Sequence, residues 1–248
     1  MVDGKKKLVL KQILITKNEG NGLLGIAVNL VCNKANVSNA TDGVIDGKTN
    51  TVTGTLNVSG GTPTGISVNP FTRRLYVPLG NSEVDIFDTK ANTYLSTTTV
   101  GSADSFAAVK LVTGNVYVTD TVTGPSTISV LTQSGTVITT VPVGDTPYGL
   151  DVDPFTNRIY VASTALNVVT AVDGKTNTVI ANVPDVPAAF VAVNYVTSKS
   201  VCVWRYLTHC TNRKIVGIDG SIQGIAALRK SLMSAMACPE FRINGLLS

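Results

Sequence analysis

Charged and aromatic side chains are scarce in this chain, and histidine occurs once. Lys, Arg, Asp and Glu make up 15% of the 248 residues, and Phe, Trp and Tyr make up 6%. Because 44% of the residues are hydrophobic, the low charge does not indicate disorder, and the chain has enough apolar surface to fold around a core. The single histidine, His209, excludes a metal site built from several histidines.

Long apolar runs and paired cysteines are also missing. No stretch reaches the roughly 18 apolar residues of a membrane-spanning helix, so no membrane span is predicted. Lys11 and Gln12 interrupt the apolar residues near the start of the sequence, and we expect no signal peptide there. The four cysteines have no Cys-x-x-Cys spacing, which disfavours a zinc ribbon or a redox motif. A disulfide between Cys202 and Cys210 is conceivable, but unpaired, half-buried thiols are favoured.

The formal net charge of +4 does not indicate a nucleic-acid-binding protein. Part of the excess comes from Lys5, Lys6 and Lys7, a cluster typical of a solvated terminus. The dense stripe of basic residues with interleaved aromatics that is typical of nucleic-acid binders is missing. We therefore expect no nucleic-acid partner.

What the sequence does contain is internal repetition. Five short segments share a pattern of small and apolar residues that ends in a valine followed by a polar residue. They are residues 25–29, 65–69, 106–110, 149–153 and 190–194. The steps between their shared valines are 40 to 43 residues, a period that is typical of repeat architectures.

The fourth copy predicts the structure of one repeat. It reads as four short strands, at residues 147–153, 158–162, 168–172 and 177–183, joined by turn-forming residues such as Asp173-Gly174. A four-stranded antiparallel sheet cannot cover both of its faces alone, whereas radial stacking of such sheets covers them. The sequence therefore predicts an all-β protein, a β-propeller of about five four-stranded antiparallel blades. The expected units lie near residues 22–60, 61–101, 102–144, 145–184 and 185–220.

Two recurring motifs carry a family resemblance. Val-Asp-Pro-Phe-Thr-Asn-Arg-Ile-Tyr-Val at 152–161 has a counterpart at 68–77, and Val-Ile-Asp-Gly-Lys-Thr-Asn-Thr-Val at 44–52 has one at 172–179. These motifs resemble the YVTN-type β-propeller repeat family, which is common in bacterial and archaeal surface proteins, including surface-layer proteins. The resemblance covers most of residues 22–220. It implies an extracellular or cell-surface location.

Both ends of the sequence depart from the repeat. Residues 1–16 are predicted to supply a lone outer strand, and the copy at 185–220 lacks a recognisable fourth strand. One hypothesis is that residues 5–16 complete the last blade as a clasp and close a five-bladed ring, which would remove exposed sheet edges. The other, which we favour, is an incomplete or open array. Residues 221–248 are predicted to form a degenerate tail with a short helix.

Most polar residues that recur from copy to copy are predicted to build turns. Asp and Asn side chains hydrogen-bond nearby backbone N–H groups in turns, and a catalytic group would be needed once rather than in every copy. The residues in question are Asp46, Asp88, Asp173 and Asp219 at one position, and Asn29, Asn69, Asp153 and Asn194 at another.

Asp151 is the exception, because its counterparts in the other copies are alanine or serine. On an innermost strand its carboxylate could point toward a central channel and bind a cation, although hard cations take about six oxygen ligands. The alternative is an isolated acid solvated by the channel. We therefore treat Asp151 as a candidate channel acid and predict no metal site.

A partial ring of basic residues is the second candidate site. Lys34, Arg74, Arg158 and Lys199 share one repeat position, just after the first hairpin turn. Propeller geometry would set them on one face, where they could attract a polyanion such as an acidic glycan. The alternative is that they are solvated turn charges that aid solubility.

Two classes of function follow from these features. The first is a non-enzymatic binding or structural module at the cell surface, whose partner is a protein or an anionic glycan or cell-wall polymer. The second is an enzyme, lactonase-like or lyase-like, acting at the channel mouth. His209 and Cys210 are adjacent, so in a strand they would point to opposite faces. We therefore predict no catalytic residue and no cofactor.

Overall fold

All the regular secondary structure in the described part of the protein is β-strand. The computed structural model describes residues 2–3, 8–9, 13, 25–38, 42–101, 104–121, 125–184, 186, 189–194, 199–203 and 216–219. No helix occurs among these residues, so none of them forms an apolar helix that could cross a membrane. The predicted all-β class is confirmed, whereas the helix predicted within residues 221–248 lies outside the described residues.

Four antiparallel sheets contain four strands each, in chain order. The first two sheets are β3(Gly25–Asn29), β4(Lys34–Ser38), β5(Asp42–Asp46) and β6(Thr51–Leu56), and β7(Ser67–Asn69), β8(Arg74–Leu79), β9(Glu83–Asp88) and β10(Thr93–Thr99). The next two are β11(Asp104–Val109), β12(Val116–Asp120), β13(Ser126–Leu131) and β14(Val137–Val143), and β15(Pro147–Asp153), β16(Arg158–Ser163), β17(Val168–Asp173) and β18(Thr178–Val183). A fifth sheet has three described strands, β19(Phe190–Asn194), β20(Lys199–Val203) and β21(Val216–Asp219).

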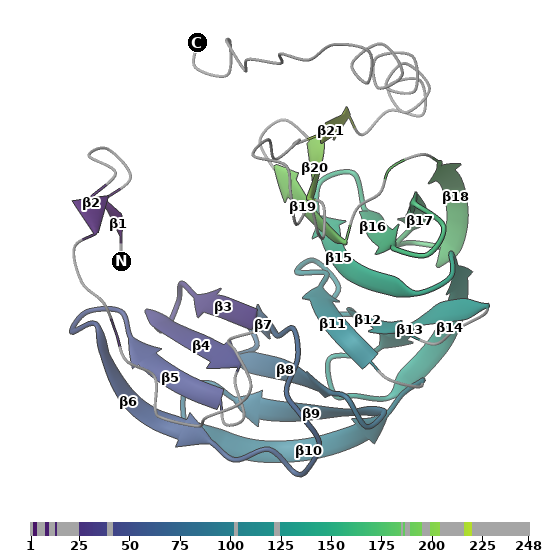
Figure 1. Ribbon diagram of the computed structural model, residues 1–248. Coiled ribbons are helices and arrows are strands. Elements are labelled where there is room, and N and C mark those ends of the chain that lie inside the picture. Colours follow the sequence, from purple (N-terminus) through teal and green to yellow (C-terminus); the bar gives the residue numbers. More distant parts are fainter. Residues whose placement is uncertain are drawn as a thin grey trace.

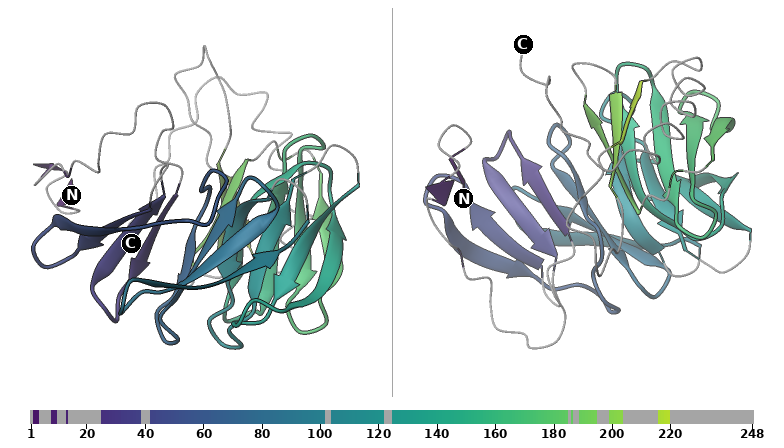
Figure 2. Two further views of the ribbon diagram at one scale, coloured as in Figure 1. Left: turned by 90° about the horizontal axis from the view of Figure 1, so that it is seen from below. Right: turned by 45° about the horizontal axis from the view of Figure 1, so that its top comes forward.

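The sheets are arranged side by side in an arc, as the blades of a propeller are (Figure 1). The first strand of each sheet lies on the inner side of the arc, and consecutive inner strands contact one another from β3 through β7, β11 and β15 to β19. The views in Figure 2 show the same fan of sheets from two other directions. The propeller prediction is thus confirmed at the level of architecture.

The apolar core is divided into clusters that each lie between two neighbouring sheets. Between the third and fourth sheets, for example, Tyr117 and Ile128 pack against Val152 and Val161. Equivalent clusters join the first sheet to the second, the second to the third, and the fourth to the fifth. The second, third and fourth sheets therefore cover their apolar faces by packing on a neighbour on each side, as expected when a single sheet cannot do so.

The first sheet differs from the others at two repeat positions. Ile26 and Val28 on β3 are 65% and 53% exposed, whereas Leu150 and Val152, which occupy the same positions on β15, are 8% and 3% exposed. In the later sheets these positions face the preceding sheet. In the first sheet this part of the inner strand is open to solvent.

Side-chain hydrogen bonds also connect neighbouring sheets near one end of the strands. The hydroxyl of Tyr76 donates to the carbonyl of Gln133 at 2.8 Å, and the hydroxyl of Tyr117 donates to Asn177 Oδ1 at 3.1 Å. Burial raises the pKa of both phenols to about 12. Both hydroxyls therefore remain protonated donors at neutral pH.

The N-terminal segment forms a hairpin of its own. Val9 and Leu8 of β2(Leu8–Val9) pair with Val2 and Asp3 of β1(Val2–Asp3). In the described residues β2 pairs with β1 and β21 pairs with β20. No pairing between β2 and the last blade occurs among the described residues, and most of residues 5–16 lie outside them, so the closing clasp stays a prediction.

Candidate functional site

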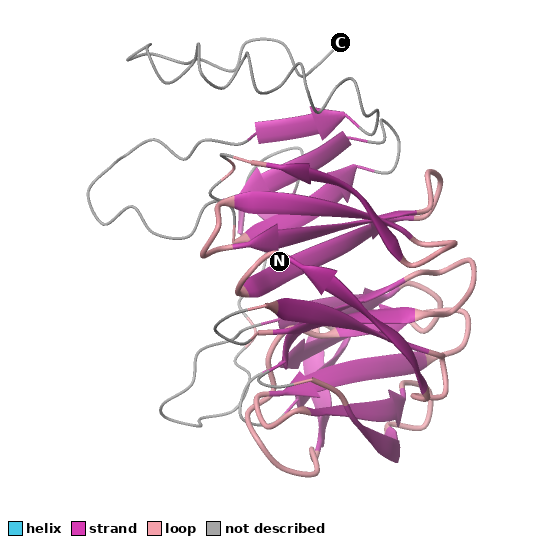
Figure 3. Cartoon of the chain, turned by 90° about the vertical axis from the view of Figure 1, so that its right-hand side faces the viewer, coloured by secondary structure: helices cyan, strands magenta, loops and turns pink. Residues whose placement is uncertain are grey.

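The best-defined surface of the protein is the end of the sheets at which the first and third hairpin turns of each blade lie. We call it the hairpin face, and it comprises the turns at 30–33, 47–50, 70–73, 89–92, 111–115, 132–136, 154–157 and 174–177. Because every sheet is an antiparallel meander that starts in the same direction, these turns line one edge of the molecule (Figure 3). The opposite end, which we call the loop face, carries the second turn of each blade and the connections between blades.

The first hairpin turn of three blades is fixed by an Asn or Asp side chain. Asn69 Oδ1 accepts hydrogen bonds from the backbone N–H groups of Phe71 and Thr72, at 3.0 and 3.2 Å. Asn29 and Asp153 accept the same pair of bonds in their own turns. The prediction that these residues build turns is confirmed, and the two hydrogen bonds fix the backbone of each turn.

The third hairpin turn is fixed in the same way by an aspartate. The Oδ1 atoms of Asp46, Asp88 and Asp173 each accept hydrogen bonds from two backbone N–H groups within the turn that follows. These N–H groups hold the pKa of all three carboxyls below its usual value. The aspartates are therefore ionised at neutral pH, and their charge is directed into the turn, as predicted for a turn-forming position.

Backbone hydrogen bonds join the two turns of a blade. Gly174 N donates to Asn157 O at 2.8 Å, and Thr89 N donates to Arg73 O at 2.8 Å. Gly47 N donates to Asn33 O in the first blade, at 2.7 Å. Each first turn thus lies directly beside the third turn of the same blade, and residues of the two turns form one local surface.

This pairing sets exposed apolar side chains beside exposed cations. Phe71 and Phe155 lie at the tips of their first turns and are 72% and 77% exposed. The neighbouring third turns carry Lys90 and Lys175, which are both exposed. The first blade repeats the arrangement with Val31 and Lys48, and the third blade supplies an apolar tip, Val112, without a cation in its third turn.

Charge is segregated between the two faces of the propeller. Every lysine and arginine among the described residues lies at the hairpin face: Lys34, Lys48, Arg73, Arg74, Lys90, Lys110, Arg158, Lys175 and Lys199. The acids at this face are the turn residues Asp46, Asp88, Asp153, Asp173 and Asp219. At the loop face, the charged residues that the structure describes are acids: Asp42, Glu83, Asp104, Asp120 and Asp145. The hairpin face is therefore the basic side of the molecule.

The four residues of the predicted basic ring lie at this face but differ in their surroundings. The amine of Lys34 donates to Thr89 O at 3.0 Å and to Asn92 Oδ1 at 3.0 Å in the next blade. Arg74 and Arg158 are half-buried at the starts of β8 and β16, where each is paired across the sheet with an aspartate at the end of the third strand. Lys199 starts β20. Lys34 is thus engaged between blades.

The more exposed cations were missed by sequence reasoning. Lys48, Arg73, Lys90 and Lys175 are all exposed. Three of them follow the turn-forming aspartate by two residues, in Asp-Gly-Lys or Asp-Thr-Lys. That spacing was the available signal. The aspartate side chain fixes the backbone of the turn, and the lysine two residues later lies at the exposed part of that turn.

Asp151 lies on the inner strand of the fourth blade, as predicted, and both of its oxygens accept backbone hydrogen bonds. Oδ1 accepts from Val152 N at 2.8 Å, and Oδ2 accepts from Val193 N, on β19 of the next blade, at 2.8 Å. Burial is the main cause that raises the pKa of this carboxyl, and the two N–H groups oppose it. Asp151 therefore links the fourth and fifth inner strands.

We expect the loss of this link to be measurable. Asp151→Ala should lower the free energy of unfolding by about 1–3 kcal/mol, because it leaves the Val193 N–H buried without an acceptor. Asp151→Asn keeps an amide oxygen and should cost less. Because the pKa of Asp151 is raised in the folded state, the free energy of unfolding should fall as the pH rises from about 4. Asp151→Asn should make this fall smaller, and urea unfolding at several pH values measures the difference. A Ca²⁺-dependent rise in Tm that requires Asp151 would instead support the cation site.

Three aromatic rings meet at the inner strands of the third, fourth and fifth blades. The ring centroids of Phe106, Tyr148 and Phe190 lie 4.8 to 5.3 Å from one another. Phe106 also fills the space above Gly65 of the second blade, and Phe190 approaches Gly149 of the fourth. This repeat position holds glycine in the first, second and fourth copies and phenylalanine in the third and fifth, and pairing between blades was not inferred from it.

Two further carboxylates are buried toward the loop face. Asp85 accepts hydrogen bonds from the backbone N–H and the hydroxyl of Ser59, at 2.6 and 2.8 Å, and from the hydroxyl of Thr97. Asp120 accepts from the hydroxyls of Thr127 and Ser129 at 2.6 and 3.0 Å, and burial raises its pKa. Both carboxylates are thus satisfied within the protein and hold loops and strands together.

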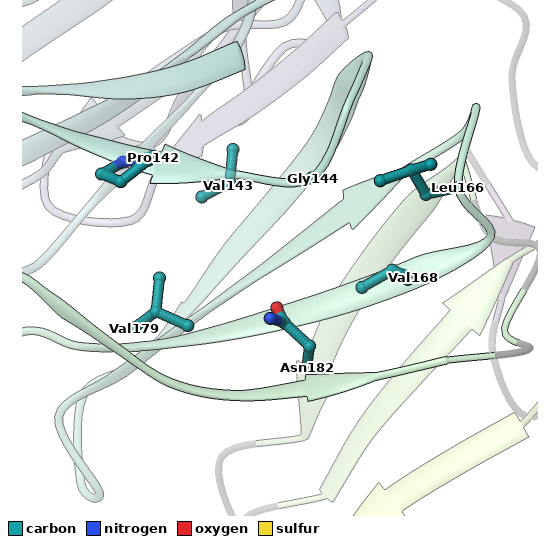
Figure 4. Close-up of a pocket in the computed structure, with 7 residues that line it drawn as sticks. All are labelled: Pro142, Val143, Gly144, Leu166, Val168, Val179 and Asn182. Carbon is teal, nitrogen blue, oxygen red and sulfur yellow. The ribbon is translucent and has the colours of Figure 1, made fainter. Parts of the chain in front are cut away.

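A pocket lies between the outer strands of the third and fourth blades (Figure 4). It is lined by Pro142, Val143, Gly144, Leu166, Val168, Val179 and Asn182. None of these seven residues titrates, and Asn182 Oδ1 already accepts a hydrogen bond from the hydroxyl of Thr170 at 2.9 Å. The pocket offers an apolar surface without a catalytic group.

The remaining candidate groups are only partly described. His209 and Cys210 lie outside the described residues, and Cys32 is half-buried and forms no disulfide. Within the described ranges, no group of three or more His, Cys, Asp or Glu side chains is placed to hold a metal ion. Whether the chain catalyses a reaction stays a prediction.

Comparisons with known proteins support the fold. No protein-family model matches the sequence, and no curated protein matches it. Among solved structures, the chain resembles hydrazine synthase from Kuenenia stuttgartiensis with a TM-score of 0.58, over 87% of this chain and 88% of that one. The two sequences are 13% identical, so the likeness concerns the propeller-like architecture alone. The class of protein defined here is thus a propeller-like all-β protein with a basic hairpin face.

Proposed function

We propose that this protein is a non-enzymatic β-propeller binding module that recognises anionic partners through its hairpin face. The observation that carries the proposal is the segregation of charge, with the described lysines and arginines at one face and only acids among the described charged residues at the other. Asp46, Asp88 and Asp173 are ionised and lower the net charge of the hairpin face, but its nine described lysines and arginines outnumber its five described acids. A surface of one sign attracts ligands of the other.

The resemblance of the repeat motifs to YVTN-type propellers supports a location at the cell surface. Partners expected there are anionic glycans, cell-wall polymers or proteins with acidic surfaces. Repeated turns on a rigid scaffold are suited to such recognition, because binding residues are often carried by loops that a framework of sheets holds in place.

Binding to heparin, as a soluble polyanion, tests the proposal. The wild-type protein should bind heparin but not neutral dextran, and the affinity should fall steeply between 0.05 and 0.3 M salt because salt screens exposed charges. Lys48→Gln with Lys90→Gln should weaken binding about fivefold to thirtyfold, since each exposed contact contributes about 0.5–1 kcal/mol. Isothermal titration calorimetry at two salt concentrations measures both effects.

A second variant separates the face from the net charge. Adding Glu83→Gln and Asp145→Asn to the double variant restores the overall charge by neutralising two acids of the loop face. If the hairpin face binds the polyanion, this quadruple variant stays weak. Recovery of wild-type affinity, or binding that does not respond to salt, would contradict the proposal.

A further inference from the structure

The exposed apolar tips of the hairpin face are not explained by polyanion binding. Leu30, Val31, Phe71, Val112 and Phe155 are between 64% and 82% exposed. They come from the first turns of four successive blades, and none belongs to the apolar clusters between the sheets. Isolated exposed apolar residues are common on proteins, but here they recur at the same turn in each blade.

These tips are held in place by their own turns. The backbone N–H groups of Phe71 and Phe155 donate to Asn69 and Asp153 at 3.0 and 2.9 Å. The residues that end the turns, Arg73 and Asn157, adopt left-handed backbone conformations with φ of 59° and 58°. The tips therefore lie on an ordered backbone, and the backbone loses little conformational entropy when the tips bind a partner.

Cations accompany the tips. The third turn, which carries the exposed Lys90 or Lys175, is hydrogen-bonded to the first turn that carries Phe71 or Phe155. A surface that combines exposed apolar side chains with lysine or arginine is suited to the interface of an anionic bilayer, where the apolar groups enter the acyl boundary and the cations remain among the headgroups.

We propose that the hairpin face docks on the surface of an anionic lipid bilayer, with the tips at Val31, Phe71, Val112 and Phe155 inserted. The inference rests on the proposed function for the cations and adds a role for the apolar tips. A fluid bilayer fits these tips better than a folded partner does. They are separate projections on different blades rather than one continuous patch, and lipids adjust to each projection independently.

Vesicle binding tests the docking surface. The probes are vesicles of phosphatidylcholine with 30% phosphatidylglycerol, and vesicles of phosphatidylcholine alone, with co-sedimentation as the measurement. The wild-type protein should bind the anionic vesicles at least tenfold more tightly. Phe71→Ser with Phe155→Ser should lower this affinity about tenfold and leave heparin binding unchanged. Leu166→Ser is the matched control, because Leu166 is 55% exposed in a turn of the loop face.

Insertion itself is observed by fluorescence. Phe155→Trp should show a blue shift of emission on anionic vesicles and quenching by brominated lipids, whereas Leu166→Trp should show neither, with the wild-type spectrum subtracted. Heparin binding without vesicle binding would overturn the bilayer proposal alone and point to a glycan or an acidic protein. Failure of both would overturn the proposed function as well. Vesicle binding that survives the double serine variant, with unchanged circular dichroism, would show that the tips do not insert.

Discussion

Replacing Gly65 by alanine is expected to lower the free energy of unfolding by about 3 kcal/mol, at the upper end of the range for overpacked sites. A Cβ atom at this position would lie 1.9 Å from Cδ1 of Phe106 on the next blade. The ring cannot move aside without cost, because it packs against Tyr148 and Phe190 at 4.8 and 5.1 Å. The urea midpoint and Tm measure the effect.

A double-mutant cycle shows whether the cost comes from this contact. In a Phe106→Ala background, Gly65→Ala should cost little, because the clashing ring is gone, so the two substitutions should be strongly non-additive. Gly54→Ala is the matched control, since nothing lies within 4 Å of its added Cβ. It should be neutral or slightly stabilising, as is usual for glycine inside a strand. Additive effects in the cycle would contradict the packing of Phe106 on Gly65.

Val152→Asp is expected to destabilise the protein by about 4 kcal/mol, whereas Val28→Asp should stay within about 0.5 kcal/mol of wild type. The two valines occupy the same position of the inner strand. Val152 is 3% exposed between the third and fourth blades, and Val28 is 53% exposed on the first. A carboxylate is costly where water is excluded and nearly neutral where it is not.

This pair of variants also reports on the open side of the arc. Urea unfolding followed by circular dichroism gives both free energies, and sedimentation at two protein concentrations detects association. If Val28→Asp is as damaging as Val152→Asp, the inner strand of the first blade is covered in solution. Equal effects would therefore contradict an exposed first sheet.

Much of the fold could be predicted from the sequence because each repeat carries its own turn chemistry. Asp173 and Asp153 were predicted to build turns, and both accept the expected backbone hydrogen bonds. The turn-forming residues of the fourth copy located its four strands. Because a lone sheet cannot cover both of its faces, the sequence also predicted that the sheets stack side by side. These conclusions depend on neighbours in the chain, which a sequence displays directly.

The details of the candidate site depend on contacts between blades, which the sequence does not display. Asp151 looked like a channel acid because it is polar among small residues, yet its carboxylate accepts the N–H of Val193 from the next strand. Lys34 looked like a member of a basic ring, yet its amine donates to Thr89 and Asn92 of the following blade. The hydrogen bonds of Asp151 and Lys34 both depend on which polar groups the neighbouring sheet places within hydrogen-bonding distance.

The meander within each blade has a consequence for how the protein is made. Every strand pairs with the strand next to it in the chain, through connections that are mostly short. Because such local pairing is fast, we expect a blade to form soon after its last strand leaves the ribosome. Each later blade then packs against a blade that is already folded, so the blades fold one after another in chain order during synthesis.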